Sequence, residues 1–195
     1  MSAVANAVCR SCGHLEEIPV RTSVNISDSP ELKQAVLSGE LFVWKCPECG
    51  ASNLMKFPFL YHDPENRLIL VLTDAPVNAE ALPEAYTGRL VGTAGELIEK
   101  VKIFDAGFDD TVIELCKFVT CNELGRKVDL RFVRRDDSEG VLLFTYPENR
   151  EMQLLSVGLN VYEDCLAIER RNPAIGESAC GLVRVDSAWL ADFVG

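Results

Sequence analysis

The chain has 195 residues, of which 48% are hydrophobic and 25% are charged. This composition is enough to bury a core and excludes a disordered protein, and the length allows one domain or two small ones. Thirty acidic side chains against nineteen basic ones give a net charge of −11, which repels phosphate backbones and argues against general nucleic-acid binding.

The first eight residues show no targeting signal. They lack a basic region followed by an apolar stretch, so we expect no signal peptide. No apolar run in the chain reaches the roughly 20 residues that a membrane-spanning helix needs. We therefore expect a cytoplasmic protein without a membrane partner, whose cysteines are reduced or bound to metal.

Two pairs of cysteines, each separated by two residues, are the strongest motif in the chain. They are Cys9 with Cys12 and Cys46 with Cys49. Two residues between thiolates let one tight turn present both sulfurs to the same ion, and a glycine follows each pair where such a turn needs a positive φ. Because two such turns supply four soft ligands in a tetrahedron, the pattern predicts a closed structural zinc site.

Other interpretations of the cysteines carry less weight. Two unrelated pairs of reduced thiols remain an alternative to the metal site. A thioredoxin-like redox pair is disfavoured, because such a pair opens a helix, whereas glycine and strand-like residues follow both pairs here. His14 could replace a sulfur, but four sulfurs are already available, so we expect it beside the site or exposed. Cys116 and Cys121 lie on different sides of one predicted helix, so we expect them to be buried core thiols. Cys165 and Cys180 have no nearby partners in the sequence, and we expect them to behave as free thiols.

The residues around the two pairs are typical of a β-ribbon with one helical insertion. The 33 residues between the pairs can fold on themselves, because the entropic cost of closing a loop grows slowly with its length. A short helix starts at Ser29 as the N-cap and ends at Gly39. Strands are predicted over 18–26, 41–45, 54–60 and 68–72, with Pro58 suggesting an edge position for the third.

A proline-containing segment, residues 74–85, is the best linker candidate, and a strand over 86–91 follows it. Thr93 and Glu96 form a capping box that opens a helix, and Asp109 or Asp110 caps the next helix. The short connection predicts an αα-hairpin over about 94–121. The second helix is apolar over a broad arc, which implies burial against the sheet or against another subunit.

The last third of the chain turns to strands. Alternating apolar residues predict a β-meander from strands near 128–132, 141–146 and 151–157. Residues 162–170 fit neither a helix nor a strand clearly, and 182–185 is expected as a last strand. Asp186 is a candidate cap for a closing turn.

Together these elements predict an α+β fold with two domains. The first, residues 1–74, is a zinc β-ribbon with a helical insertion. The second, residues 75–195, combines the helix pair with an antiparallel β-meander over about 127–195.

The chain resembles the bacterial and archaeal CpXC family at several places. Its second cysteine pair, Cys46-Pro47-Glu48-Cys49, carries the motif for which the family is named. The likeness covers residues 7 to about 120 and extends through Ser23-Val24-Asn25, Pro30-Glu31-Leu32, Leu60-Tyr61-His62-Asp63-Pro64 and Ile103-Phe104-Asp105-Ala106-Gly107. The resemblance implies a zinc-ribbon-like fold, in a family without an established biochemical role, with zinc ligated by Cys9, Cys12, Cys46 and Cys49. The first pair departs from the pattern because it lacks the proline of the second.

Three functions follow from these features, in order of preference. The first is a zinc-binding structural or interaction module whose partner is another protein or, in a homodimer, a second copy. The second is a metal-dependent enzyme that uses His62 and Asp63 near the ribbon, although Asp-Pro is an ordinary turn initiator. The third is a nucleic-acid-binding ribbon, which is disfavoured because residues 1–60 carry five basic and six acidic side chains and so offer no positive surface.

Overall fold

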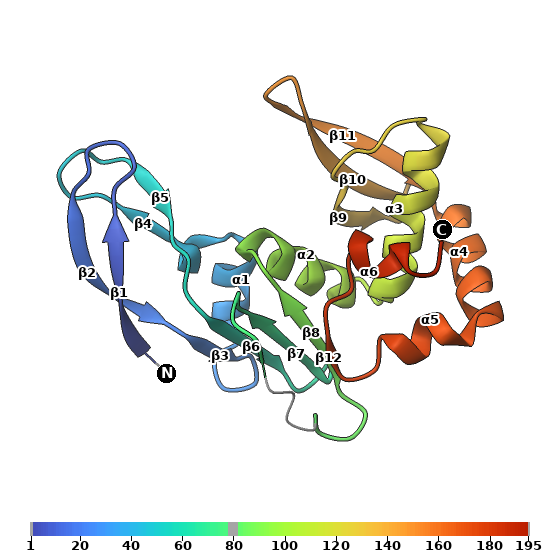
Figure 1. Ribbon diagram of the computed structural model, residues 1–195, viewed down its shortest axis with the longest axis horizontal. Helices are drawn as coiled ribbons and strands as arrows, with labels where there is room; N and C mark the ends of the chain where they lie inside the picture. Colours follow the sequence, from blue (N-terminus) through green and yellow to red (C-terminus); the bar gives the residue numbers. More distant parts are fainter. Residues whose placement is uncertain (1, 78–81, 195) are drawn as a thin grey trace. The chain divides into compact units, whose positions relative to one another are not determined.

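Figure 1 shows a computed structural model of the chain, which describes residues 2–77 and 82–194. It divides into two compact units, one extending to Ile98 and the other beginning at Glu99. The fold is mixed α+β, as the sequence predicts, with six α-helices and several sheets in the described ranges. The border predicted between residues 74 and 75 stays a prediction, and the predicted linker 74–85 lies in part outside the described residues. None of the described helices is long and apolar enough to cross a bilayer.

The first unit is built mainly of strands. Its elements are β1 (Ser2–Val8), β2 (Leu15–Arg21), β3 (Ser23–Asn25), α1 (Glu31–Leu37), the 3-10 helix η1 (Glu40–Phe42), β4 (Val43–Lys45), β5 (Ser52–Leu54), β6 (Phe59–Asp63), β7 (Leu68–Leu72) and β8 (Thr87–Val91). Helix α2 (Ala94–Asp105) then carries the chain into the second unit.

Two antiparallel hairpins hold the two cysteine pairs at their turns. β1 pairs with β2, β4 pairs with β5, and Figure 1 shows the two hairpins side by side. Alternate side chains of these strands face inward and form a small core. That core has four buried residues: Ala7, Cys9, Trp44 and Cys46. Half of these buried residues are cysteines from the predicted metal site, and three partly buried residues pack against them: Ile18, Ala51 and Met55.

The remaining four strands of the first unit form a sheet in the order β8-β7-β6-β3. The central pair is antiparallel and the two outer pairs are parallel. Alternate residues of β6 and β7 are buried, among them Tyr61 and Leu70 with no exposed surface. Helix α1 contacts this sheet through Lys33, whose Nζ donates a hydrogen bond to Asp63 at 3.2 Å.

The strand predicted over 54–60 is interrupted. β5 ends at Leu54 and β6 begins only at Phe59. Pro58 lies directly before β6, because it has no N–H to contribute to a strand ladder. β6 is a central strand of its sheet, so the edge position suggested by this proline is not observed.

The second unit contains a three-stranded sheet and most of the helices. After α2 its elements are α3 (Asp110–Glu123), β9 (Arg131–Asp136), β10 (Val141–Glu148), β11 (Glu151–Gly158), α4 (Leu159–Arg171), α5 (Pro173–Ser178), β12 (Leu182–Val183) and α6 (Ser187–Ala191). β9, β10 and β11 pair in sequence order, antiparallel throughout.

Helix α3 is covered on two sides by its own unit. On one side Ile113 packs in a cluster with Phe132 of the sheet. On the other side Val112 packs with Cys165 of α4 and Leu190 of α6. The broad apolar arc that the sequence left open to a sheet or to another subunit is therefore buried within the chain.

Beyond Gly158 the chain is mainly helical. This differs from the prediction, which left residues 162–170 undecided and extended the β-meander to residue 195. The local preference of this segment is divided, because helix formers such as Leu166 and Ala167 stand beside β-branched and aromatic residues. The apolar residues also recur at helical spacing, so that Val161, Tyr162 and Cys165 face the cluster beside α3. Tertiary packing thus decides for α4 where the local preference is divided.

Most predicted helix caps are observed. The Thr93 hydroxyl accepts from the Glu96 N–H at 3.1 Å, and the Glu96 carboxylate accepts from a backbone N–H before it. Asp109 caps α3 and Asp186 caps α6 through side-chain oxygens. Ser29 is the exception, because Pro30 occupies the cap position of α1 and no side-chain capping bond forms there.

A buried ion-pair network joins elements of the second unit. Lys117 Nζ donates to Glu99 at 2.6 Å and to Glu114 at 2.8 Å, and Lys100 Nζ donates to Asp110 at 2.6 Å. Burial disfavours the charged form of Glu99, but Lys117 and the further donors around this carboxylate outweigh it and hold its pKa below the usual range. Burial has the opposite result at Glu114, whose pKa is raised. The network is stable only as long as each charge keeps its partner.

We expect Lys117→Met to lower the free energy of unfolding by about 3–5 kcal/mol, because it removes the buried cation that lies between the carboxylates of Glu99 and Glu114. Of the described cations, Glu99 then keeps only the partly exposed Arg131, and Glu114 keeps only Lys100 at 3.9 Å. The measurement is urea denaturation of the full chain at neutral pH. Lys127→Met removes an exposed cation and serves as the control, with an expected change within about 0.5 kcal/mol. The difference between the wild type and Lys117→Met should shrink as the pH falls and the two carboxylates become protonated. Equal losses in the two variants would contradict the assignment.

Candidate metal centre

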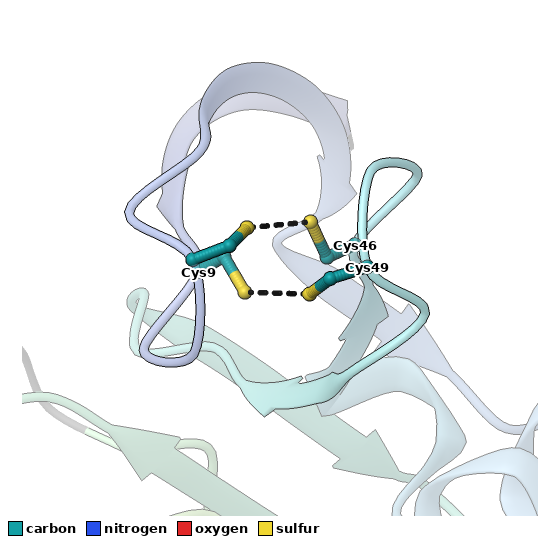
Figure 2. Close-up of side chains that lie close together, drawn as sticks. Cys9, Cys46 and Cys49 are labelled. Carbon is teal, nitrogen blue, oxygen red and sulfur yellow. Dashed lines mark hydrogen bonds between the residues drawn. The ribbon is translucent and has the colours of Figure 1, made fainter.

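The four predicted ligands meet at one point. The sulfurs of Cys9, Cys12, Cys46 and Cys49 all lie within 4.8 Å of one another. The Sγ atoms of Cys9 and Cys49 are 3.5 Å apart and those of Cys12 and Cys46 are 3.6 Å apart, as the dashed lines of Figure 2 indicate. A tetrahedron with metal–sulfur bonds of about 2.3 Å has edges of about 3.8 Å, so this arrangement could hold a metal ion.

The first cysteine turn is closed by its own backbone. The Cys9 N–H donates to the His14 carbonyl at 2.8 Å, and the Gly13 N–H donates to the Cys9 carbonyl at 2.9 Å. Gly13 has a φ of 74°. A side chain at this position would meet nothing within 4 Å, so the backbone conformation and not lack of space requires the glycine.

The second cysteine turn repeats the same pattern at the same offsets. The Cys46 N–H donates to the Ala51 carbonyl and the Gly50 N–H donates to the Cys46 carbonyl, both at 2.9 Å. Gly50 has a φ of 71°. The two turns are therefore equivalent in backbone structure and present their sulfurs to each other from separate hairpins (Figure 2).

The group has a buried side and an exposed side. Cys9 and Cys46, the first cysteine of each turn, are each 1% exposed and belong to the small hydrophobic core. Cys12 and Cys49, the second cysteine of each turn, are exposed. Solvent and reagents therefore reach the group from the side of the turns.

The sulfurs cannot all ionise easily on their own. The N–H groups of Cys12 and Ser11 stabilise the Cys9 thiolate and, against the effect of burial, lower its pKa to about 6. At Cys12 the backbone of His14 favours the thiolate, but burial and the three neighbouring sulfurs outweigh it and raise the pKa to about 12. A divalent cation would balance the negative charge and allow all four thiolates to form, so the donor set fits a metal ion.

His14 lies beside the group and not in it. Its ring stacks on Trp44 with 6.3 Å between ring centroids, and its Nε2 is 3.9 Å from a Glu16 carboxylate oxygen. Its carbonyl closes the first turn. The metal-ligand group found among the described residues consists of the four cysteines, in agreement with the position expected for His14.

Asn53 is a residue of the site that the sequence analysis did not identify. It lies on β5, is 5% exposed, and its Nδ2 is 3.6 Å from the Cys9 sulfur. The sequence contained one signal for this residue: Asn53 lies two residues after Ala51, which closes the second cysteine turn, and so takes an inward-facing position on the strand.

His62 and Asp63 take separate partners. They are successive residues of β6 and so point to opposite faces of the sheet. His62 Nε2 lies 3.3 Å from the Tyr86 hydroxyl. Asp63 is buried and accepts from Lys33 and from the backbone and side chain of Asn66. Neither belongs to the four-sulfur group, so the enzyme hypothesis gains no support from this geometry.

All eight cysteines are free thiols in the structure. Cys116 is fully buried, as expected, whereas Cys121 is only partly buried and its thiol donates to the Val128 carbonyl at 3.5 Å. Cys165 was expected to lack a nearby partner, but it lies against Cys116 between α3 and α4. The hydrogen bond between the two thiols lowers the pKa of Cys165, and the same bond together with burial raises the pKa of Cys116. Cys180 is exposed.

The comparison with protein families agrees with this site. A family model described as CpXC protein matches residues 7–117, which include both cysteine turns. The chain belongs to the CpXC family. No curated protein and no solved structure matches the chain.

We expect Trp44 to report on the metal centre. In a Trp189→Phe chain Trp44 is the only tryptophan, and it packs in a core of which half is cysteine. Removal of metal by a chelator should shift its fluorescence emission to longer wavelength, because the core opens to water, and added zinc should reverse the shift.

Trp44→Phe supplies the control for this experiment, because its remaining tryptophan, Trp189, lies in the second unit, and its emission should not change with the chelator. An unchanged emission of Trp44 after elemental analysis has verified the loss of metal would contradict the prediction.

Proposed function

We propose that this member of the CpXC family is a zinc-stabilised protein-interaction module, in which Cys9, Cys12, Cys46 and Cys49 hold one zinc ion. The observation that carries the proposal is the convergence of four sulfurs from two separate hairpins within 4.8 Å. In this proposal the two hairpins form a zinc β-ribbon with α1 as its helical insertion. Outside this ribbon, the α+β fold contains the sheet of β3, β6, β7 and β8, the pair α2 and α3, the sheet of β9 to β11 and the C-terminal helices α4 to α6.

The donor set favours zinc in a structural role. Four thiolates are soft ligands, and a tetrahedral arrangement of four protein ligands is typical of structural zinc. Such a site leaves no coordination position for water or substrate, in contrast to catalytic zinc. The ion would cross-link two segments that are 34 to 40 residues apart in the chain.

The size of the surrounding core explains why a metal is needed. Four buried residues form the cluster between the hairpins, and two of them are proposed ligands. A cluster of this size supplies little hydrophobic stabilisation, so small domains of this kind depend on a metal. The free energy of zinc binding would then be part of the free energy of folding.

The hairpins also expose apolar side chains that support an interaction role. On the outer face of β1 and β2, Val8 lies opposite Leu15, and these residues are 55% and 63% exposed. Val43 and Leu54 form a second exposed pair across β4 and β5. The partner would be another protein or a second copy of the chain. Nucleic acid is disfavoured because residues 1–60, which contain both hairpins, have a net charge of −1 and do not attract phosphate groups.

The state of the cysteines bears on the compartment. A chain with eight free thiols, of which two are exposed members of the site and one is the exposed Cys180, suits a reducing environment. We therefore place the protein in the cytoplasm as part of the proposal.

The proposal is tested by elemental analysis combined with thermal unfolding. Purified protein should contain close to one zinc ion per chain, and a chelator should unfold the hairpin region. Cys46→Ser should lose the zinc and the corresponding transition, because it removes a buried ligand. Cys180→Ser removes an exposed thiol outside the group and should keep both.

A metal-free wild type with an unchanged melting profile would reject the proposal. Light scattering on the same samples tests the second copy as the partner, since a mass of two chains supports it and a mass of one chain excludes it. Substituting Val8 and Leu15 by glutamate should then abolish the interaction, while Val77→Glu, at an exposed apolar residue outside the hairpins, should not.

A further inference from the structure

We propose that Asn53 is the positioning residue of the metal centre, whose side-chain amide seats Cys9 and the first cysteine turn on β5 and thereby raises the affinity of the four sulfurs for metal. The inference rests on the proposed function, because it concerns the same site. It assigns a role to a residue that is not itself a ligand.

The amide of Asn53 bridges the two cysteine turns. Its Nδ2 donates to the Cys9 sulfur at 3.6 Å and to the Ala51 carbonyl at 3.0 Å, and its Oδ1 accepts from the Arg10 N–H at 2.9 Å. An asparagine side chain offers two N–H groups and one carbonyl oxygen, and all of them are used here. Asn53 is 5% exposed, so water competes little for these bonds.

The bonds tie together segments that are far apart in the sequence. Arg10 and Cys9 lie 43 and 44 residues before Asn53. Ala51, in contrast, closes the second turn through its carbonyl, which also accepts from the Cys46 N–H. One side chain therefore contacts a sulfur and the backbone of the first turn and the closing carbonyl of the second.

The backbone equivalence of the two turns shows why only one of them needs this residue. The residue after the first cysteine is Arg10 in the first turn and Pro47 in the second. Arg10 has an N–H that requires an acceptor in this partly buried place, whereas proline has none. Asn53 supplies that acceptor, so its presence fits the missing proline of the first turn.

The equivalent strand position beyond the first turn carries a different side chain. Asn53 lies two residues after Ala51, and Glu16 lies two residues after His14. The Glu16 carboxylate is an acceptor only, and it lies near the His14 ring at 3.9 Å. A carboxylate next to a thiolate would repel it, so an amide is required at the position that contacts sulfur and a carboxylate is tolerated at the other.

The physical effect of Asn53 on a bound metal is twofold. An N–H donated to a metal-bound thiolate stabilises its negative charge, and a fixed donor orients the sulfur before the metal arrives. Partners of this kind around metal ligands typically change metal affinity by about 10- to 100-fold.

The test compares Asn53→Asp with Glu16→Gln in the full chain. Asn53→Asp keeps the shape and the acceptor oxygen but replaces the donor at sulfur by a second oxygen, so zinc affinity measured by competition with a chromogenic chelator should fall by about 10- to 100-fold. Glu16→Gln changes the equivalent residue of the other turn and should leave the affinity unchanged. The Co²⁺ spectrum of Asn53→Asp should keep the four-thiolate pattern of the wild type, because the ligands are the same.

Wild-type zinc affinity in Asn53→Asp would overturn the inference while leaving the proposed function intact. A wild-type chain that binds neither zinc nor Co²⁺ through four thiolates would instead reject the proposed function. If Asn53→Asp does not fold, amide hydrogen exchange on the zinc-loaded wild type decides. The Arg10 N–H should be protected through its bond to Asn53, and exchange at the rate of an unstructured peptide would overturn the assignment.

Discussion

The structure of the two hairpins β1–β2 and β4–β5 depends on four sulfur atoms that lie within 4.8 Å of one another. Thiolates at such distances repel one another, as the raised pKa of Cys12 beside the lowered pKa of Cys9 indicates. They also occupy half of a core that has only four buried residues. The same atoms would therefore be a source of repulsion without a cation and the main cross-link with one, and in the proposed function metal binding would be linked to the folding of these hairpins.

The second unit is stabilised by different means. It has two clusters of buried apolar residues on either side of α3 and an ion-pair network in which Lys117 lies between Glu99 and Glu114. These interactions need no metal, and the apolar surface of α3 is used up within the unit. The interaction role proposed above would therefore fall to the exposed apolar pairs of the hairpins, such as Val8 with Leu15, and not to the buried face of α3.

The sequence predicted what short-range chemistry determines. The spacing of the cysteines, the glycines after each pair, and the caps at Thr93, Asp109 and Asp186 are local patterns with local consequences. It could not predict α4, because the helix and strand preferences of this segment are divided and its packing on α3 decides between them. It also missed Asn53, because two of its three partners, Arg10 and Cys9, lie more than 40 residues away in the chain, where no local pattern reveals them.

The position of each cysteine within its turn gives the site two different sides. The first cysteine of each turn ends the inward-facing pattern of a strand and is buried, while the second lies on the turn and is exposed. Asn53 contacts the sulfur of a buried cysteine, so the hydrogen bond that supports the site comes from the core. A metal ion held here would be anchored from inside by Cys9 and Cys46 and would exchange, or meet an oxidant, from outside at Cys12 and Cys49. The stability of the hairpins and the reactivity of the site would then be set by different members of one ligand group.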